Sequence, residues 1–180
     1  MKKIIFVTGN DRKLGEARET CDLFDITVLQ EVADIDEIQS HDPLKVSEHK
    51  ARAAYEQVNK PVVVTDTFWS IPAVNGFPGA YMKEVVQWFS EQDFLNLVLG
   101  KNDNRIMFIE NITYFDGTEV VRFGKDFWGK IVSPRGTGNS LENVAEFDGV
   151  TLGEKRATGG FSHTPEDYVW YDFAKWFSGK

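Results

Sequence analysis

The spacing of apolar residues along the chain predicts its first elements. Ile4 to Thr8 is an apolar run typical of a buried strand, and Gly9 and Asn10 stop it. The next segment, "DRKLGEARETCDLF", carries apolar residues at helical spacing, and Asp25 to Leu29 again resembles a strand. A strand, a loop, a helix and a second strand in this order indicate an α/β protein.

The pattern continues with alternating elements. The polar, acidic segment "EVADIDEIQSHDP" is expected to be a loop, and residues 43–58 outline an amphipathic helix. The apolar "VVVTD" predicts a strand that ends at Asp66, in front of a turn rich in glycine and proline. Two short helices are expected next, "MKEVVQWF" and "EQDFLNLVL".

The second half of the chain has a different character. Two long β-like runs, "RIMFIENITYFDG" and "TEVVRFGKDFWGKIV", flank Asp116-Gly117, which is a strong hairpin signal. Residues 141–160 show no clear pattern, and "PEDYVWYDFAKWF" predicts a closing helix with Pro165 in its first turn. We therefore expect one domain over residues 1–180, with a mixed sheet flanked by helices and two lobes around a central cleft.

Composition narrows the class of protein. With 180 residues, 42% hydrophobic and 13% aromatic, the chain can bury a proper core. Its net charge of -8 argues against a nucleic-acid polymer as partner, because a phosphate backbone requires a basic face. A single nucleotide is not excluded, since it needs only a few local lysines and backbone N–H groups.

Cysteine content and hydropathy indicate the cellular compartment in which the protein is expected. Cys21 is the only cysteine, so no intrachain disulfide and no cysteine-based zinc site can form, and a buried thiol is the favoured interpretation. The apolar run in "MKKIIFVTGN" is too short for a signal peptide, and no run approaches the about 18 apolar residues of a membrane span. We expect a soluble, cytoplasmic protein without membrane partners.

The segment "TGNDRK" is the first candidate for chemistry. It joins a strand to a helix, where unpaired N–H groups at the helix N-terminus favour an anion. Gly9 permits close approach to the backbone, Thr8 and Asn10 supply short polar side chains, and Lys13 adds positive charge. The spaced glycines of a Walker loop are absent. A phosphate site and an ordinary capped turn are both open interpretations.

Acidic residues form the second group of candidates. Asp34, Asp36 and Glu37 lie in the acidic loop, and such carboxylates suit magnesium, although a solvated loop is the favoured interpretation. Asp66 follows an apolar strand, and ligands of α/β sheets bind at strand ends. There it could hold a metal or take a proton from water, or it could cap the following turn.

Three basic residues complete the candidates. His163 in "GGFSHT" could contact a base or a phosphate, although a lone histidine is more often structural. Lys50 and Lys83 are expected on helix faces near the loops above, and an isolated surface lysine normally serves only solubility.

Taken together, these motifs resemble the Ham1/inosine triphosphatase family, the pyrophosphatases of non-standard purine nucleoside triphosphates. The likeness begins with "FVTGNDRKLGE", which is similar to the family's "FVTGN..K..E". It continues in the family's order through about the first half of the chain, and more weakly through "FWGKIVSPRGTG" and "TLGEK". The motifs of the first half are "IDEIQS", the helix with Lys50, "VVVTDT" and "NGFPGAYMK".

The resemblance implies a role for each matching residue. It assigns the triphosphate to Thr8, Gly9, Asn10, Asp11, Arg12 and Lys13. It makes Glu37 and Asp66 the carboxylates that face Mg²⁺, with Mn²⁺ as the alternative ion, and Asp66 the catalytic residue as base, ligand or both. The residues that it implies for nucleotide contact are Lys50, Thr67, Lys83, Lys155, His163 and Thr164.

The resemblance also implies the fold, the reaction and the assembly. The fold would be an elongated mixed sheet, and the reaction would convert a nucleoside triphosphate to the monophosphate and pyrophosphate. The protein would be a homodimer.

The chain departs from the family pattern at three places. The family has two acids before its Thr or Ser, as in "EDT" or "DDS", and Thr65 replaces the first. The motif "GFG.DP.F" is not recognisable after "PRGTG", and Thr164 replaces the arginine of "SHR". The phosphate-binding half is thus kept while the base-reading half is altered. A pyrophosphatase for another base and a nucleotide-binding protein without catalysis are the alternatives.

Overall fold

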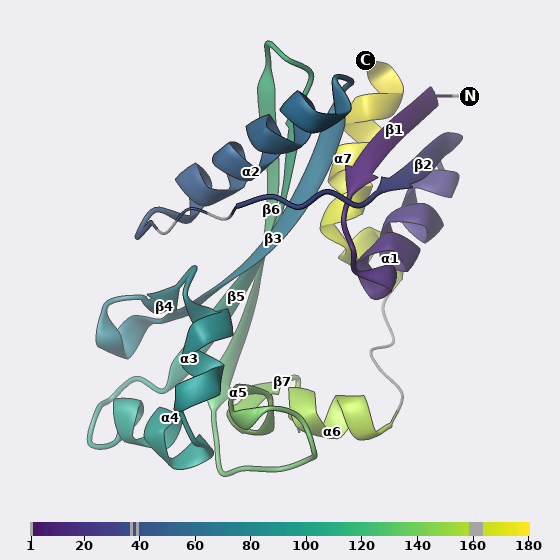
Figure 1. Ribbon diagram of the computed structural model, residues 1–180. Helices are drawn as coiled ribbons and strands as arrows, with labels where there is room; N and C mark the ends of the chain where they lie inside the picture. Colours follow the sequence, from purple (N-terminus) through teal and green to yellow (C-terminus); the bar gives the residue numbers. More distant parts are fainter. Residues whose placement is uncertain (1, 37, 39, 159–163) are drawn as a thin grey trace. The chain divides into compact units, whose positions relative to one another are not determined.

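The chain has a mixed α/β fold, which confirms the predicted fold class. A computed structural model describes residues 2–36, 38, 40–158 and 164–180 (Figure 1). Its open mixed sheet has the strand order β2-β1-β3-β5-β6-β7-β8, with β4 paired to β3, and helices flank it. The chain divides into two compact units, residues 1–66, 110–125 and 163–180, and residues 67–109 and 126–162. The central cleft stays a prediction.

The first unit contains the parallel part of the sheet. Strand β1 pairs in parallel with β2, where Ile4 lies opposite Val28, and with β3, where Phe6 lies opposite Val63. Its elements are β1 (Lys2–Val7), α1 (Asp11–Asp22), β2 (Ile26–Glu31), α2 (Pro43–Val58), the start of β3 (Val62–Ile71), the end of β5 (Arg105–Phe115), the start of β6 (Val120–Ile131), the 3-10 helix η2 (Pro165–Asp167) and α7 (Val169–Gly179).

Helices cover both faces of this parallel part. Phe6 and Val63 pack with residues of α1 and α7, such as Ala17 and Phe173. Figure 1 shows α1 and α7 side by side. On the other face, α2 packs against Val62 and Val64 through residues with small side chains, Ala51 and Ala54. Successive side chains of a strand alternate between these two faces, so each strand residue can be assigned to one of them.

Strand β3 is longer than the sequence indicated. It continues past Asp66 to Ile71, so the prediction that Asp66 ends the strand was wrong. Four of the five residues after Asp66 are β-branched or aromatic and extend the strand, and Ile71 pairs with Phe77 of the antiparallel β4. Phe68 is 5% exposed and belongs to the interior, whereas Trp69 is partly buried and packs against Phe108 and Phe147.

The second unit has its own apolar cluster, which includes Ile71, Phe94, Ile106 and Leu141. Its remaining elements are the 3-10 helix η1 (Pro72–Val74), β4 (Phe77–Gly79), α3 (Met82–Trp88), α4 (Glu91–Val98), α5 (Ser140–Val144), β7 (Ala145–Phe147), β8 (Val150–Thr151) and α6 (Leu152–Ala157).

The last four of these elements correct the expectation that residues 141–160 lack a pattern. They contain two to six residues each, which is too short for a helical or strand period to show in the sequence. The segment 159–160 lies outside the described residues.

The predicted hairpin between β5 and β6 is confirmed. The Asp116 carboxylate accepts hydrogen bonds from the backbone N–H groups of Thr118 and Glu119, at 3.0 and 2.8 Å. Gly117 has a φ of 97°, a conformation that side chains rarely adopt. A Cβ atom at this position would also collide with the ring of Tyr55, which lies on α2 and packs edge-on against Phe115.

We predict that Gly117→Ala destabilises the protein more than Gly100→Ala. Both glycines have positive φ, but a Cβ at Gly100 (φ 71°) would meet open space. Gly100→Ala should therefore lower the free energy of unfolding by about 1 kcal/mol. Gly117→Ala must also displace Tyr55 and should cost about 2–4 kcal/mol. Urea unfolding of both variants measures their free energies of unfolding. Equal losses of unfolding free energy in the two variants would contradict the contact between Gly117 and Tyr55.

Candidate active site

The loop after β1 is an ordered helix cap. Asn10 is the N-cap of α1, and its Oδ1 accepts a hydrogen bond from the Lys13 backbone N–H at 3.2 Å. The Asn10 N–H in turn donates to Thr8 Oγ1 at 3.1 Å, and the Thr8 N–H donates to the Glu31 carbonyl at 2.9 Å. The segment "TGNDRK" therefore is a capped turn. Because α1 begins here, the same loop also presents the positive end of a helix.

Asp66 lies toward the end of the sheet at which this loop begins. The parallel register places Val63 opposite Phe6, so Asp66 lies beyond this pair, on the side of the sheet where β1 runs into the loop. The carboxyl ends of parallel strands are where ligands of α/β sheets bind.

Asp66 forms an ion pair with Lys50. The Lys50 Nζ donates to Asp66 Oδ1 at 2.7 Å, and the two side chains are only 19% and 12% exposed. Lys50 reaches Asp66 because α2 packs closely on the face of the sheet that also carries Val62 and Val64. The interpretation of Lys50 as a merely solubilising surface lysine was therefore wrong. Since Asp66 lies within a strand and pairs with a lysine from another element, it is not a cap of the following turn.

Lys13 is the second lysine of this site. Burial of its ammonium lowers the pKa of Lys13, and the positive charges of Lys50 and Arg12 lower it further. The carboxylates of Asp66 and Glu110 act in the opposite direction. The structure thus brings Lys13, Lys50 and Asp66 within electrostatic reach of one another, although they come from three separate elements.

Glu110 is a residue that the sequence interpretation missed. It lies on β5, and burial raises the pKa of its carboxyl group, as does the nearby Glu16. Arg12, Lys13 and Lys125 act in the opposite direction. The signal for it is weak, because Glu110 is a single acid in the β-like run "RIMFIENITYF", as Asp66 is in "VVVTDTFW".

The other charged residues of "TGNDRK" lie on the first turn of α1. Asp11 and Arg12 are exposed on that turn, where Arg12 forms an ion pair with Glu16.

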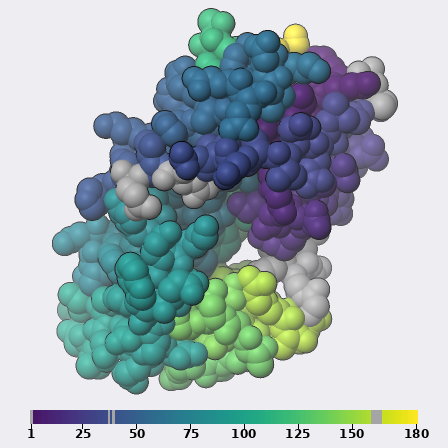
Figure 2. Space-filling model, in the orientation of Figure 1, coloured from purple at the N-terminus to yellow at the C-terminus, as the bar shows by residue number. Residues whose placement is uncertain are grey.

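The acidic residues Asp34 and Asp36 belong to a different segment, the one before α2, which lies on the surface (Figure 2). The Asp34 carbonyl accepts a hydrogen bond from Gln57 at 2.8 Å.

The remaining predicted residues are distributed over the chain. Glu37 and His163 lie outside the described residues. In the first unit, Thr164 forms a capping box with Asp167 at the start of η2. Thr67, Lys83 and Lys155 belong to the second unit, on β3, α3 and α6, and Lys83 is exposed there. Their contacts with a nucleotide stay predictions.

The donor chemistry of the site suits magnesium. Within residues 2–36, 38, 40–158 and 164–180, no three His, Cys, Asp or Glu side chains converge as a metal cage. Magnesium rarely uses such a cage and is usually bound by one or two carboxylates together with substrate phosphates and water. The Asp66 carboxylate within β3, beside two lysines, is compatible with that mode of binding.

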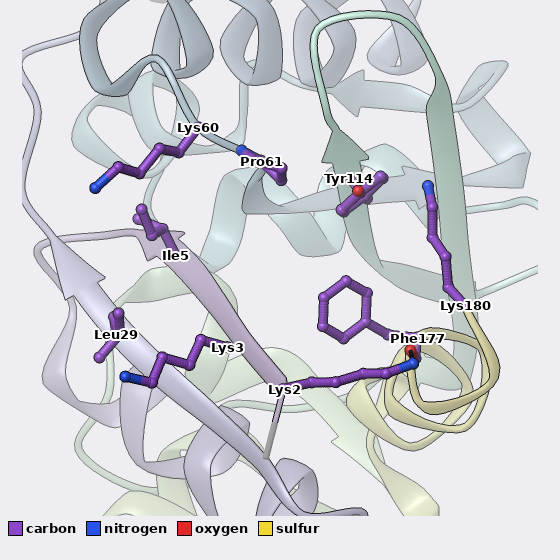
Figure 3. A pocket seen from close by; sticks show the side chains of 9 residues that line it. All are labelled: Lys2, Lys3, Ile5, Leu29, Lys60, Pro61, Tyr114, Phe177 and Lys180. Carbon is purple, nitrogen blue, oxygen red and sulfur yellow. Dashed lines mark hydrogen bonds between the residues drawn. The ribbon is translucent and has the colours of Figure 1, made fainter.

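A separate hollow of about 510 Å³ lies at the opposite ends of the strands, near Lys2 of β1 and Pro61 before β3. Figure 3 shows the rings of Tyr114 and Phe177 on one side of it and Lys3 on the other. Because substrates of parallel sheets bind at carboxyl ends, we do not assign this hollow to the nucleotide.

Two of the lysines that line this hollow form hydrogen bonds or ion pairs with other residues. Lys2 Nζ donates to the Phe177 and Ser178 carbonyls at 3.0 and 2.8 Å, and Lys180 forms ion pairs with Asp116 and Glu119. Both contacts fasten the end of α7 to the sheet.

A helix N-terminus, two lysines and a carboxylate at the carboxyl edge of parallel strands are typical of α/β proteins that bind phosphorylated ligands. Comparison with known sequences is more specific. The model of the Ham1 family matches residues 4–154, and the chain belongs to this family. No helix in the described part of the chain is long and apolar enough to span a membrane.

Similar proteins include curated enzymes and solved structures. The chain is 33% identical over 183 residues to the dITP/XTP pyrophosphatase of Methanosarcina acetivorans, covering 100% of both chains. It is 34% identical over 155 residues to the inosine triphosphate pyrophosphatase of Fusarium vanettenii, covering 84% of this chain and 83% of the relative. A HAM1 protein structure from Coxiella burnetii has a TM-score of 0.79 at 18% identity, with 100% of both chains covered. The fold is therefore that of Ham1 structures.

The lowered pKa of Lys13 predicts a pH dependence of anion binding. An anion binds the charged ammonium, so affinity should fall as pH rises through the lowered pKa, earlier than an ordinary lysine would allow. In Lys13→Arg the positive charge persists at all relevant pH values. The variant should therefore lose less affinity for the anion than the parent protein as pH rises. Calorimetric titration with inorganic tripolyphosphate from about pH 7 to about pH 10 compares the two. Parallel pH profiles would contradict this role of Lys13.

Proposed function

We propose that this protein is a nucleoside triphosphate pyrophosphatase that releases a nucleoside monophosphate and pyrophosphate. The observation that carries the proposal is the gathering of Lys13, Lys50 and Asp66 beside the capped N-terminus of α1. Membership of the Ham1 family supports it, as do the pyrophosphatase names of the similar proteins from Methanosarcina and Fusarium.

Phosphate binding requires local positive charge, because the whole chain carries a net charge of -8. Lys13 and Lys50 would supply that charge from α1 and α2, and the free N–H groups of the first turn of α1 would add to it. Both ammonium groups are partly withdrawn from water, where their attraction for phosphate oxygens is stronger than at an exposed surface.

Asp66 and Glu37 would hold Mg²⁺, or Mn²⁺ in its place, against the phosphate oxygens. Such an ion, when bound, neutralises developing negative charge on the phosphoryl group. Asp66 is suited to this role because it lies within β3 and its side chain is held by the Lys50 contact. A rigidly held oxygen donor costs little reorganisation when the ion arrives.

Asp66 is also the residue best placed to take a proton from water. When a phosphate draws the Lys50 ammonium toward itself, the Asp66 oxygen that accepts from Lys50 becomes available. Water that loses its proton to Asp66 would attack at the α–β linkage. The new bond joins the water oxygen to phosphorus, the α–β anhydride bond breaks, and pyrophosphate leaves with the electron pair.

The base, the assembly and the location are the finer parts of the proposal. The names of the relatives favour a non-canonical purine, whereas the altered motifs, including Thr164 in place of arginine, favour a changed base preference. Family resemblance favours a homodimer, and the hydropathy of the sequence favours a cytoplasmic location.

The decisive variant is Asp66→Asn. It keeps the size of the side chain and an oxygen that can accept from Lys50, but removes the charge and the basic oxygen. We predict that it lowers turnover by about 10²–10⁴-fold in a protein that is still folded at the assay temperature, although the melting temperature should fall because the partly buried Lys50 loses its counter-charge. Pyrophosphate release is measured over a panel of nucleoside triphosphates with Mg²⁺.

Asp172→Asn is the matched control, because Asp172 is exposed on α7 and should leave turnover unchanged. Full activity in Asp66→Asn would refute the assignment.

A nucleotide-binding protein without catalysis is the second candidate, and Thr65 in place of an acid favours it. The same panel separates the two. Thermal stabilisation by a nucleotide, with no pyrophosphate released from any member of the panel, would establish the binding protein instead.

A further inference from the structure

The hollow at the start of β1 lies entirely within the first unit and takes no part in the reaction proposed above. It is found where β1 has no neighbour on the side of β3. Val62, the first residue of β3, lies opposite Ile5, so residues 2–4 of β1 extend beyond the beginning of β3. Lys2 and Lys3, which line the hollow, belong to this extension.

The walls of the hollow are apolar. Ile5 and Leu29 lie opposite each other on β1 and β2, and Pro61 stands just before β3. The rings of Tyr114 and Phe177, with centroids 6.0 Å apart, form another wall (Figure 3). Leu29 is 43% exposed, so part of this apolar surface is open to a ligand. The volume of about 510 Å³ is within the range of about 300–1,000 Å³ that is usual for small-molecule sites.

The charges around the hollow are all positive. Four of its nine lining residues are lysines and none is acidic, in a chain with a net charge of -8. Lys180 is paired with two carboxylates, whereas Lys2 donates to neutral carbonyl groups. Within the described part of the chain, the ammonium groups of Lys3 and Lys60 form no hydrogen bond or ion pair. The hollow therefore has positive charge that no carboxylate of its own wall compensates.

This combination of walls and charges selects the chemistry of a ligand. Figure 3 shows Lys3 and Lys60 on the same side of the hollow as Leu29, across from Phe177. An anionic group could bind at the two ammonium groups while the rest of the ligand covers the apolar walls. That rest must lack polar groups, because the apolar walls would leave them without hydrogen-bond partners. A nucleotide does not meet this condition, since its base and ribose are polar.

We propose that the hollow binds a small amphipathic anion, namely a carboxylate with a hydrocarbon chain. The carboxylate binds at Lys3 and Lys60, and the chain covers Ile5, Leu29 and the ring of Phe177. The enclosed volume is that of a site for a free molecule, not of a flat surface for a membrane. This inference is independent of the proposed function, because none of the lining residues takes part in the proposed reaction.

The first test is a calorimetric titration with hexanoate, octanoate and decanoate below the concentrations at which they form micelles. Affinity should rise about fourfold for each added CH₂ group, because each group covers more of the apolar walls. Decanol, which lacks the charge, should bind about three- to tenfold more weakly than decanoate. An affinity that does not rise with chain length, or no binding of decanoate, would overturn the proposal.

The second test removes the two free ammonium groups in the double variant Lys3→Gln/Lys60→Gln. Both lysines are exposed, so decanoate affinity should fall only about three- to tenfold, and its dependence on salt should become weaker. Lys101→Gln is the matched control, since Lys101 is an exposed lysine of the second unit and should leave the affinity unchanged. A double variant that binds decanoate as tightly as the parent protein would refute the role of these lysines.

A third test examines the apolar wall with two variants of equal shape. Leu29→Glu places a negative charge beside the bound carboxylate, whereas Leu29→Gln only reduces the apolar surface. Because Leu29 is partly exposed on β2, both variants should fold, and thermal unfolding checks this. Decanoate affinity should fall at least about threefold further in Leu29→Glu than in Leu29→Gln. Parent affinity in both variants would show that decanoate binds elsewhere.

Competition experiments separate this site from the candidate active site. Inorganic tripolyphosphate should bind with the same affinity in the presence and absence of saturating decanoate, and mutual exclusion would contradict a separate site. If no nucleotide is hydrolysed, the proposed reaction fails while binding of decanoate still supports this inference. If pyrophosphate is released but decanoate does not bind, the inference alone fails. Sedimentation with anionic phospholipid vesicles, without binding of decanoate, would indicate a membrane-binding surface instead and would overturn the proposal.

Discussion

The Lys50–Asp66 ion pair is the contact on which the candidate active site depends. Its two members come from α2 and β3, and both are mostly withdrawn from water. A partly buried carboxylate without a cation would be costly, and the same holds for the lysine. The pair forms where alanines on α2 pack against the valines of β3. Close packing of small residues therefore determines where the charged groups of the site lie.

Around this pair the first unit concentrates positive charge in a chain that is acidic overall. Lys13 is held at the start of α1 by the Asn10 cap and lies within reach of Asp66. Its lowered pKa shows that burial and neighbouring cations outweigh the attraction of Asp66 and Glu110. A polyphosphate would supply a further counter-charge to these partly buried ammonium groups. The same groups thus explain both the unfavourable electrostatics of the unliganded protein and its expected affinity for a triphosphate.

Much of this arrangement could be predicted from the sequence. The helix over residues 43–58, the hairpin at Asp116-Gly117 and the first strand–helix–strand unit all have strong local signals and are confirmed. Asp66 and Lys50 could be named because they match family motifs, but their ion pair depends on packing between distant segments. Glu110 was missed because a single acid in a β-like run has no spacing that marks it.

Other parts of the fold had no clear local signal. The short elements between residues 140 and 157 have too few residues to show a period, and contacts between neighbouring segments stabilise them. The end of β3 was placed too early because an acid was taken as the end of an apolar strand. In the structure Asp66 is tolerated inside the strand, since Lys50 compensates its charge.

The most direct measurement is a crystal structure with Mg²⁺ and a nucleoside triphosphate whose α–β bridge cannot be hydrolysed. The account predicts the triphosphate at the N-terminus of α1, with Lys13 and Lys50 on its oxygens and Asp66 facing the ion. A triphosphate bound instead in the hollow beside Lys2 and Lys60, with the Lys50–Asp66 pair undisturbed, would contradict the account.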